Sequence, residues 1–471
     1  MGSLSGLFDM SRSALIADQT ALNATANNVA NQNTVGYTKQ VVSFSAGDVV
    51  TLTGGSNSTV LSSSGPQATT TTVRDRVLEQ RLQQQMQAQS SSSAESDVLT
   101  QIQNVFTVSG STASTGSTQI GTALNSFFSS LTALAGNPTS SATQQGVLSA
   151  ASVLATTLNS AATQLQTVGT TLNSGISSSV TAVNALTATI AGLNQQISQV
   201  SPHGDAGALE DQRQLAIEQL SQDVGLDQIT TENNGITLTT QGGSVLVQGG
   251  TASALTSGIA NGASLILDRS GKNVTAGVQG GSIGGQIAGQ SVDLPAATTA
   301  LDALAYQVAT AVNTQNQAGL TTAGVAGTAI FTVPAGATGS AATISVIPTN
   351  PSAIATAAIG EGESGNGNAS ALANLATNVD SSGQTVTGRL GAMLAQIGST
   401  ASSLQQQTTA QQATVTQLTT QRNSLSSVSL DTEAANLSQY QKSYQAAAQL
   451  LTVLDQLMAT AINLGTQTTV T

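Results

Sequence analysis

Side chains that could act as nucleophiles, bases or metal ligands are few and scattered in this sequence of 471 residues. The chain has no cysteine and a single histidine, His203, which lies beside proline and glycine in the segment SPHGDAG. Thiol catalysis is therefore excluded, and the usual zinc sites cannot be assembled from one imidazole. A histidine in such a loop is typical of a solvated surface residue rather than a catalyst.

The carboxylates that lie close together in the sequence are explained without catalysis. Glu361 and Glu363 lie in the glycine-rich stretch GEGESGNGN, which is typical of a solvated turn. Asp205, Glu210 and Asp211 surround the start of a helical pattern. Weak cation binding is one reading of this group, but capping of the helix and interaction with its positive end explain it more simply. The stretch GGSIGGQIAG lacks the Lys-Ser/Thr pair of a phosphate loop. The sequence thus predicts a protein with no active site, no cofactor and no metal.

Composition narrows the class of protein further. The chain has 11 Lys and Arg against 23 Asp and Glu, a net charge of −12, so we expect no nucleic-acid partner. Charged residues are 7% of the chain, against about a quarter in an average soluble protein. Aromatic residues are only 2%, so the cores must be thin and aliphatic, which suits long helices packed on neighbours or other subunits. We found no apolar run that approaches a membrane span and no cleavable signal peptide, so we expect no membrane insertion.

Both ends of the chain carry helical apolar patterns. Phe8, Leu15, Leu22 and Val29 recur at intervals of seven and predict an N-terminal helix. We expect it to end near NNVANQNTVGYTKQ (27–40), where asparagines and a glycine favour turns and left-handed backbone.

The C-terminal pattern alternates steps of three and four, as in the seam of a coiled coil. A second apolar row lies beside this seam, so the apolar face is wide enough for more than one partner. Most such stripes are cores within one chain, but the small, aromatic-poor ends favour packing between subunits. The seam consists of Leu437, Tyr440, Tyr444, Ala447, Leu451, Leu454, Met458 and Ala461, and the second row of Leu450, Leu457 and Leu464.

Between the two ends the period of the pattern changes. We predict helices at 74–108, 120–135, 165–200 and 208–223, and a helical stretch at 371–464 with breaks near Gly383 and at 424–431. The segment 227–249 alternates polar and apolar residues around Asn234-Gly235 and Gly242-Gly243, which predicts a β-meander. Further strand-like pieces are 264–268, 328–333 and 342–347, with one helix at about 292–317.

These patterns predict a mainly α fold with an inserted β-rich domain. Long coiled-coil-like helices at the N- and C-termini (1–65 and 430–471) pack together as a terminal core. An α-helical rod body follows (66–228 and 366–429). A β-rich outer domain with one internal helix (229–365) is inserted into the rod.

Specific stretches resemble one known family. Residues 20–40, TALNATANNVANQNTVGYTKQ, resemble the N-terminal signature of the bacterial flagellar axial proteins, which include rod, hook and hook-associated proteins. Residues 429–464 resemble the matching C-terminal helix of that family. The internal stretches 127–148, 208–227 and 301–324 are most similar to its hook-associated protein 1 branch, the first junction protein between hook and filament.

The resemblance implies an extracellular structural protein of the bacterial flagellum that assembles through its terminal helices. It implies export by the flagellar type III apparatus without a cleaved signal peptide, and a chaperone that binds the C-terminal helix. It implies a ring of about eleven copies between the hook protein and the second hook-associated protein. The alternatives are another axial subunit of hook type, or a secreted adhesin rich in Ser, Thr and Gly.

We expect the assembly interface to be formed by residues of both ends. In this hypothesis Gly36 eases the turn of the chain out of an inner helical tube, and Tyr37 packs against a neighbouring helix; the alternative is an ordinary loop after a helix. The N-terminal set is Phe8, Leu15, Leu22, Val29, Asn27, Asn28, Asn31, Gly36 and Tyr37, and the C-terminal set is Leu437, Tyr440, Tyr444, Leu451, Leu454 and Met458.

Overall fold

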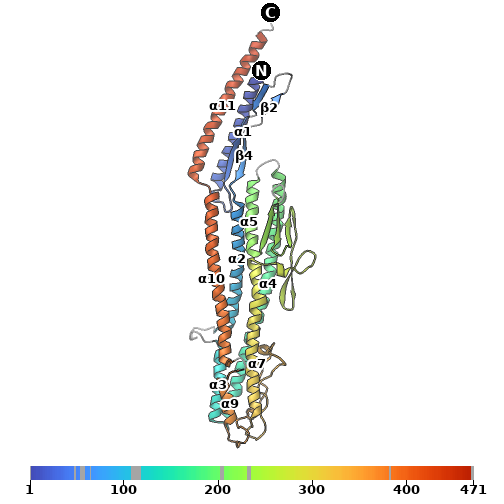
Figure 1. Ribbon diagram of the computed structural model, residues 1–471, viewed down its shortest axis with the longest axis vertical. Coiled ribbons are helices and arrows are strands. Elements are labelled where there is room, and N and C mark those ends of the chain that lie inside the picture. Colours follow the sequence, from blue (N-terminus) through green and yellow to red (C-terminus); the bar gives the residue numbers. More distant parts are fainter. Residues whose placement is uncertain are drawn as a thin grey trace.

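The molecule is a long helical rod with a narrower helical unit at one end, which carries both chain termini (Figure 1). The computed structural model describes residues 2–46, 49–52, 59–63, 65–107, 118–201, 206–230, 235–380 and 383–467. His203, Asp205 and Asn234, which the sequence analysis discussed, lie outside these residues.

The unit at the end, here called the terminal module, is built from the two ends of the chain. Helices α1 (Gly2–Asn31) and α11 (Leu430–Gln467) pack against each other, as predicted. Strands that the sequence analysis did not predict lie beside α1, and they form two antiparallel pairs, β1–β4 and β2–β3. Because β1 and β4 are paired, the predicted boundary between residues 65 and 66 would divide a sheet, and the rod begins a few residues later. These strands are β1 (Gln40–Ser45), β2 (Val49–Leu52), β3 (Thr59–Ser63) and β4 (Gln67–Thr72).

The rod is a bundle around one very long helix, α4 (Ser141–Val200). This helix begins well before the predicted start near Leu165, because Val147, Leu154 and Leu158 continue the same buried stripe. The predicted breaks near Gly383 and at 424–431 are confirmed, the second as the gap 427–429 between α10 and α11. The other helical segments are α2 (Arg76–Phe106), α3 (Gln119–Gly136), α5 (Gly207–Asp223), η2 (Thr275–Gly277), α6 (Gly281–Ala288), the π-helical turn η3 (Gly289–Asp293), α7 (Leu294–Ala318), α8 (Ser340–Thr343), η4 (Pro351–Ala353), α9 (Gly367–Asn374) and α10 (Val386–Ser426).

The largest core fills the half of the rod that lies away from the terminal module. Helices α2, α3, α4, α7, α9 and α10 contribute apolar side chains to it. Phe127 lies at its centre, with ring centroids 5.5 Å from Phe128 and 5.7 Å from Phe331. Contrary to the sequence expectation that no segment approaches a membrane span, helix α4 is long and apolar enough to cross a membrane by length and composition alone. Its buried positions recur in steps of three and four against the other rod helices, the pattern of a core helix in a soluble bundle.

A second core lies between α4, α5 and a small antiparallel sheet in the order β5-β6-β7-β8. The predicted meander is confirmed, and Gly243 takes the positive φ of 81° that its turn requires. A further hairpin, β9–β10, packs on α4. The strands are β5 (Leu226–Thr230), β6 (Ile236–Thr240), β7 (Val245–Gln248), β8 (Thr251–Ala252), β9 (Thr256–Ala260) and β10 (Ala263–Leu267).

Two expectations for the inserted region are wrong. The segments 328–333 and 342–347 form no regular strands but meet in a single bridge between Phe331 and Val346. Asp302 of α7 accepts hydrogen bonds from the backbone N–H groups of Gly339 (2.7 Å) and Ala341 (2.9 Å), which favours the short helix α8 instead.

The prediction of one helix within 229–365 is also wrong, because α6, α7 and α8 all lie there. Helix α7 belongs to the large core of the rod rather than to a separate β-rich unit. The glycines of GGSIGGQIAG allow α6 to approach α2 closely. A Cβ on Gly285 would lie 2.1 Å from the backbone oxygen of Ser91, and one on Gly289 would lie 2.6 Å from Cγ1 of Val98. These glycines therefore serve helix packing.

Candidate assembly interface and the joint beneath it

Helix α1 buries its small side chains and exposes large ones. Ala17, Ala21 and Ala24 are 4% exposed or less, and they recur at the three- and four-residue steps of one helical face. Ile16 and Val29 are 57% and 37% exposed. The face that packs within the chain is thus an alanine face, which lets neighbouring backbones approach closely.

The predicted N-terminal interface residues lie mostly beside this alanine face rather than on it. Asn28 alone is buried, and it is used within the chain. Phe8, Leu15, Leu22, Asn31 and Tyr37 are half-buried, while Asn27, Val29 and Gly36 are exposed.

The predicted interface residues of α11 also fall into two groups, some buried within the chain and others exposed. Leu454 is buried, and the ring of Tyr440 packs at 5.9 Å on Phe44 of β1, so both are used within the chain. Leu437 and Leu451 are half-buried, whereas Tyr444 and Met458 are exposed.

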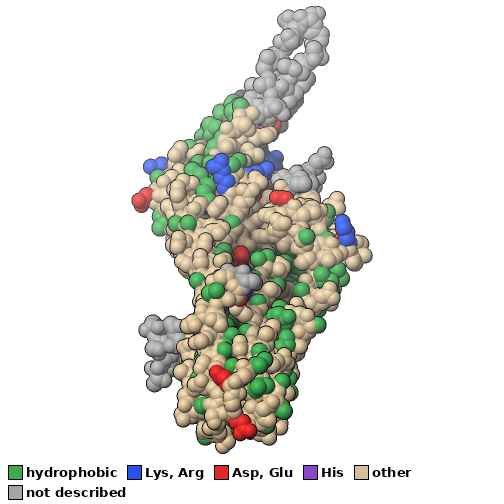
Figure 2. All heavy atoms as spheres, turned by 60° about the horizontal axis from the view of Figure 1, so that its bottom comes forward, with side chains coloured by type: hydrophobic (Ala, Val, Ile, Leu, Met, Phe, Trp, Pro, Cys, Tyr) green, Lys and Arg blue, Asp and Glu red, His purple; other side chains and the backbone are tan. Residues whose placement is uncertain are grey.

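A row of large apolar side chains on α11 is about half exposed. Leu450, Val453 and Leu457 are 52%, 52% and 51% exposed, and their spacing of three and four places them on one face. Ile462 continues the exposure toward the end of the helix. Figure 2 shows hydrophobic side chains at the surface of this narrow end of the molecule, with several Lys and Arg side chains just below them. Below, this row is called the outer row.

The side chain of Asn28 in α1 holds the segment that follows this helix, residues 32–40, by hydrogen bonds. The Asn28 side-chain amide donates to the backbone oxygen of Gln40 (2.8 Å) and to Oε2 of Glu433 (3.1 Å). Asn28 Oδ1 accepts from the Tyr37 hydroxyl (2.9 Å) and from the backbone N–H of Gln40 (2.8 Å). One asparagine therefore fixes the turn, the start of β1 and the first turn of α11.

Glu433 is a buried carboxylate at the start of α11. It is 1% exposed, and Nζ of Lys39 lies 3.3 Å from Oε1. The backbone N–H of Lys39 also donates to the oxygen of Ser426 at the end of α10 (3.0 Å). Removing either partner of a buried charge is costly, so these contacts hold α11 against the turn.

Gly36 adopts the left-handed conformation that the sequence suggested, with φ of 83°. It faces Leu215 of α5, since a Cβ built on Gly36 would lie 3.7 Å from the Cβ of that leucine. The hydroxyl of Tyr37 bonds within its own chain, to Asn28. The predicted role of both residues in contacts with another subunit stays a prediction.

Asp211 of α5 meets the same segment from the rod. Its Oδ2 accepts from the backbone N–H of Thr38 (2.9 Å), and its Oδ1 pairs with the guanidinium of Arg74. Burial raises the pKa of Asp211, and the Thr38 hydrogen bond and Arg74 oppose that rise. The expectation that Asp211 merely caps its helix is wrong, because its partners are remote in sequence.

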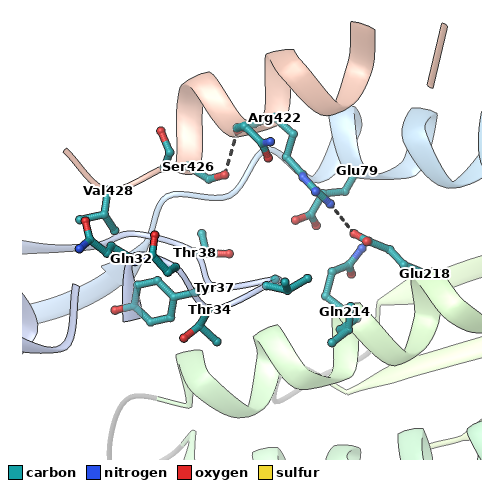
Figure 3. A pocket seen from close by; sticks show the side chains of 16 residues that line it. Gln32, Thr34, Tyr37, Thr38, Glu79, Gln214, Glu218, Arg422, Ser426 and Val428 are labelled. Carbon is teal, nitrogen blue, oxygen red and sulfur yellow. Dashed lines mark hydrogen bonds and ion pairs between the residues drawn. The ribbon is translucent and has the colours of Figure 1, made fainter. Parts of the chain in front are cut away.

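A cavity of about 350 Å³ lies under the turn, between α5 and α10 (Figure 3). Nη1 of Arg422 lies 2.7 Å from Oε1 of Glu218 across it, and Nε of Arg74 lies 3.4 Å from Oε1 of Glu79. Burial raises the pKa of Glu79 to about 7, while Arg74 acts in the opposite direction. Arg74 and Arg422 therefore lie close to Glu79, Glu218 and Asp211. This charged cluster, together with the turn 32–39 above it, is called the joint below.

Comparison with known proteins places these parts of the chain in families. The family model described as "Flagellar hook-associated protein FlgK helical domain" matches residues 99–331. Residues 8–38, which include most of α1 and the turn, match "Flagella basal body rod protein". Residues 420–464 match "Flagellar basal body rod FlgEFG protein C-terminal".

Curated relatives agree with these matches. The "Flagellar hook-associated protein 1" of Bacillus subtilis is 29% identical, over 97% of this chain and 97% of its own length. This chain belongs to the flagellar hook-associated protein 1 family. The Escherichia coli relative of the same name is 28% identical over 70% of this chain, but the match spans only 60% of that protein's length.

A solved structure shares the fold of the family. It is described as the flagellar hook junction protein FlgK from Burkholderia pseudomallei. The two chains align with a TM-score of 0.65 and 20% identity, over 74% of this chain and all of the other. A helical body with a β-containing part is therefore a fold that this chain shares with a solved structure. The family is one of structural flagellar proteins, components of an extracellular appendage.

Sequence reasoning missed the charged residues of the joint. Arg74 and Asp211 lie 137 positions apart, and no spacing rule connects them. Glu433 had a weak signal, since it is a carboxylate close to an apolar seam. The outer row had a clear signal, because the second apolar row on the C-terminal helix already included Leu450 and Leu457.

Proposed function

We propose that this chain forms the junction between the flagellar hook and the filament. In this proposal the terminal module is the assembly unit, and a ring of about eleven copies lies between the hook protein and the second hook-associated protein. The observation that carries the proposal is the outer row on α11, with the exposed Ile16 and Val29 of α1. Apolar rows of this kind mark protein contacts when a monomer leaves them uncovered.

The outer row contributes to the stability of such contacts. Full burial of one leucine or valine side chain contributes about 1.5–3 kcal/mol, so covering the exposed half of each contributes about half of that. In a closed ring every copy meets two neighbours, and the contributions of both interfaces stabilise the same terminal helices.

We further propose that the chain is exported unfolded by the flagellar type III apparatus, without a cleaved signal peptide. The chain has no cysteine, so no disulfide can form before passage. A chaperone that covers the outer row of α11 would protect this apolar surface before assembly. Long helices with an uncovered apolar face are marginal by themselves, which favours their ordering on assembly.

The first test is electron microscopy of a deletion strain, with the culture medium assayed for flagellin. Hooks without filaments, together with flagellin monomers in the medium, are the expected result. Normal filaments would overturn the proposal and favour a secreted adhesin. Loss of the hook itself would favour a hook-type subunit, which is present in many more copies.

A sharper test uses the outer row. Leu457→Asp places a charge on a residue that is 51% exposed in the free chain, so the soluble protein should keep its circular dichroism. In a packed interface the same charge costs several kcal/mol, and incorporation into the flagellum should be lost. Thr452→Asp is the matched control, because it adds the same charge to the same helix at an exposed position. Thr452 lies one turn from Asp455, where the helix already carries an acidic side chain. Normal motility of the Leu457→Asp strain would contradict the proposed interface.

A further inference from the structure

The terminal module is attached to the rod by very few contacts. Helices α1 and α11 pack extensively on each other, and α1 also packs on the nearby strands. Among the described residues neither helix packs extensively on any helix of the rod. The link consists of two short connectors, 73–75 and 427–429, and of the turn 32–39, which reaches back to α5 and α10 (Figures 1 and 3).

We propose that Asp211 and Arg74 are positioning residues that fix the direction of the terminal module relative to the rod. Asp211 belongs to the rod helix α5, Arg74 to the connector that precedes α2, and Thr38 to the turn of the terminal module. One carboxylate joins all three segments, because Oδ2 accepts from the Thr38 backbone and Oδ1 pairs with Arg74.

Further bonds show that the turn and the connector behave as one unit at this point. The backbone N–H of Val73 donates to the oxygen of Lys39 (2.9 Å), directly beside both partners of Asp211. Nη2 of Arg74 lies 3.5 Å from the Thr38 hydroxyl. Asp211 and Thr38 are 8% and 6% exposed, so water cannot easily replace their bonds.

Apolar packing cannot hold this angle in place of the charged contacts. The cavity of about 350 Å³ lies directly beneath the turn, and its wall contains Glu79, Glu218 and Arg422. Both apolar cores lie within the rod and contain no residue of α1 or α11. A loosely packed joint with a few directional bonds depends on those bonds for its geometry.

The inference concerns the free chain, so it can fail while the proposed junction function stands, and the reverse also holds. It can be tested by pulsed electron spin resonance distance measurements, for which the natural absence of cysteine makes introduced labels specific. One label at Gln449 of α11 and one at Gln412 of α10 report across the joint, since both residues are exposed. The labelled chain is diluted with unlabelled chain, so that only distances within one molecule are measured.

The chain with Asp211 intact should give one narrow distance peak, and Asp211→Asn should lose that peak to a broad distribution. Asp211→Asn keeps the shape of the side chain but removes the charge that pairs with Arg74. Arg74→Lys, which keeps the charge, should retain most of the narrow peak. A purely structural loss of fold would instead alter a second label pair inside the rod, Gln412 with Thr189, which we expect to be unchanged.

Asp380→Asn is the matched control variant. Asp380 pairs with Arg389 in the rod, away from the joint, so its loss should leave the distance between Gln449 and Gln412 as it is. A broad distribution for the chain with Asp211 intact would overturn the inference. So would an Asp211→Asn chain that keeps its narrow peak.

Discussion

The rod and the terminal module use apolar residues in opposite ways. In the rod, Phe127 and Leu131 are fully buried, and the large core around them includes residues of α2, α3, α4, α7, α8, α9 and α10. Among the described residues of the terminal module, the buried apolar ones are three alanines and Leu454, while the outer row is about half exposed. The same aliphatic composition therefore produces one part that buries its large apolar side chains and one part that leaves several of them exposed.

This difference is consistent with the proposal that the terminal module, and not the rod, makes the contacts with other subunits. A core with buried phenylalanines stabilises the rod before any assembly. A pair of helices that meet through alanines buries little area per residue, so its stability depends on additional contacts. In the proposal of export and assembly through the terminal helices, the rod is stable by itself and the terminal module is stabilised by contacts with neighbouring subunits. The joint between the two parts depends on charged and polar contacts instead.

The largest effect on stability should come from removing a large side chain from the core of the rod. Phe127→Ala removes a ring that packs on Phe128 and Phe331, which should lower the free energy of unfolding by about 3–5 kcal/mol. Chemical denaturation monitored by circular dichroism measures this loss. Val153→Ala on the exposed face of α4 is the control, with an expected change within about 0.5 kcal/mol. Equal losses in both variants would refute the picture of a self-sufficient rod.

The next effect concerns the joint and depends on pH. The folded chain holds Glu79 with a pKa of about 7, against 4.5 for the ordinary side chain, so the folded state binds more protons between these values. Stability should therefore fall as the pH rises from about 4.5 to 7 and then level off. Glu79→Gln should remove this part of the pH dependence and add up to about 3 kcal/mol of stability above pH 7.

Thermal unfolding of both proteins between pH 5 and pH 8 checks this. The groups that face Glu79 are Arg74 and Arg422, which favour its charged form, and Glu218 and Asp211, which oppose it. A Glu79→Gln variant with the same pH dependence as the parent chain would show that Glu79 is not the group concerned.

A smaller, local effect is expected in the terminal module. Asn28→Ala removes the amide that donates to Glu433 and Gln40, which should destabilise the module by about 1–3 kcal/mol. Hydrogen exchange should then accelerate in α1 and α11, while the amides of α4 keep their protection. Uniform acceleration along the whole chain would mean that the module and the rod unfold together, and the comparison drawn above would fail.

The smallest expected effect is on stability, and its sign should differ between two glycine-to-alanine substitutions. Gly36 has φ of 83°, so Gly36→Ala should destabilise the turn by about 1 kcal/mol, although the added Cβ finds space. Gly398 lies in helix α10 with nothing within 4 Å of a built Cβ, so Gly398→Ala should stabilise by up to about 1 kcal/mol. Melting temperatures that shift in the same direction for both variants would count against the role of Gly36 in the turn.

The sequence by itself determined most of the long helices and the meander, but not the start of α4 or the strands β1 to β4. Steps of three and four predicted the long helices, and alternation around Gly242-Gly243 predicted the meander. Resemblance of the two ends to flagellar axial proteins is borne out by the family matches. These features could be predicted because spacing and turn chemistry act between residues that are close in the chain.

Only the tertiary structure decided which faces are used and which charges meet. The intervals of Phe8, Leu15 and Leu22 marked a helix, but the alanine face beside them packs within the chain. Asn28 bonds to Glu433 across 405 positions, and Thr38 to Asp211 across 173. No local pattern encodes such pairs, because a buried hydrogen bond or ion pair depends on where the whole fold brings its two partners.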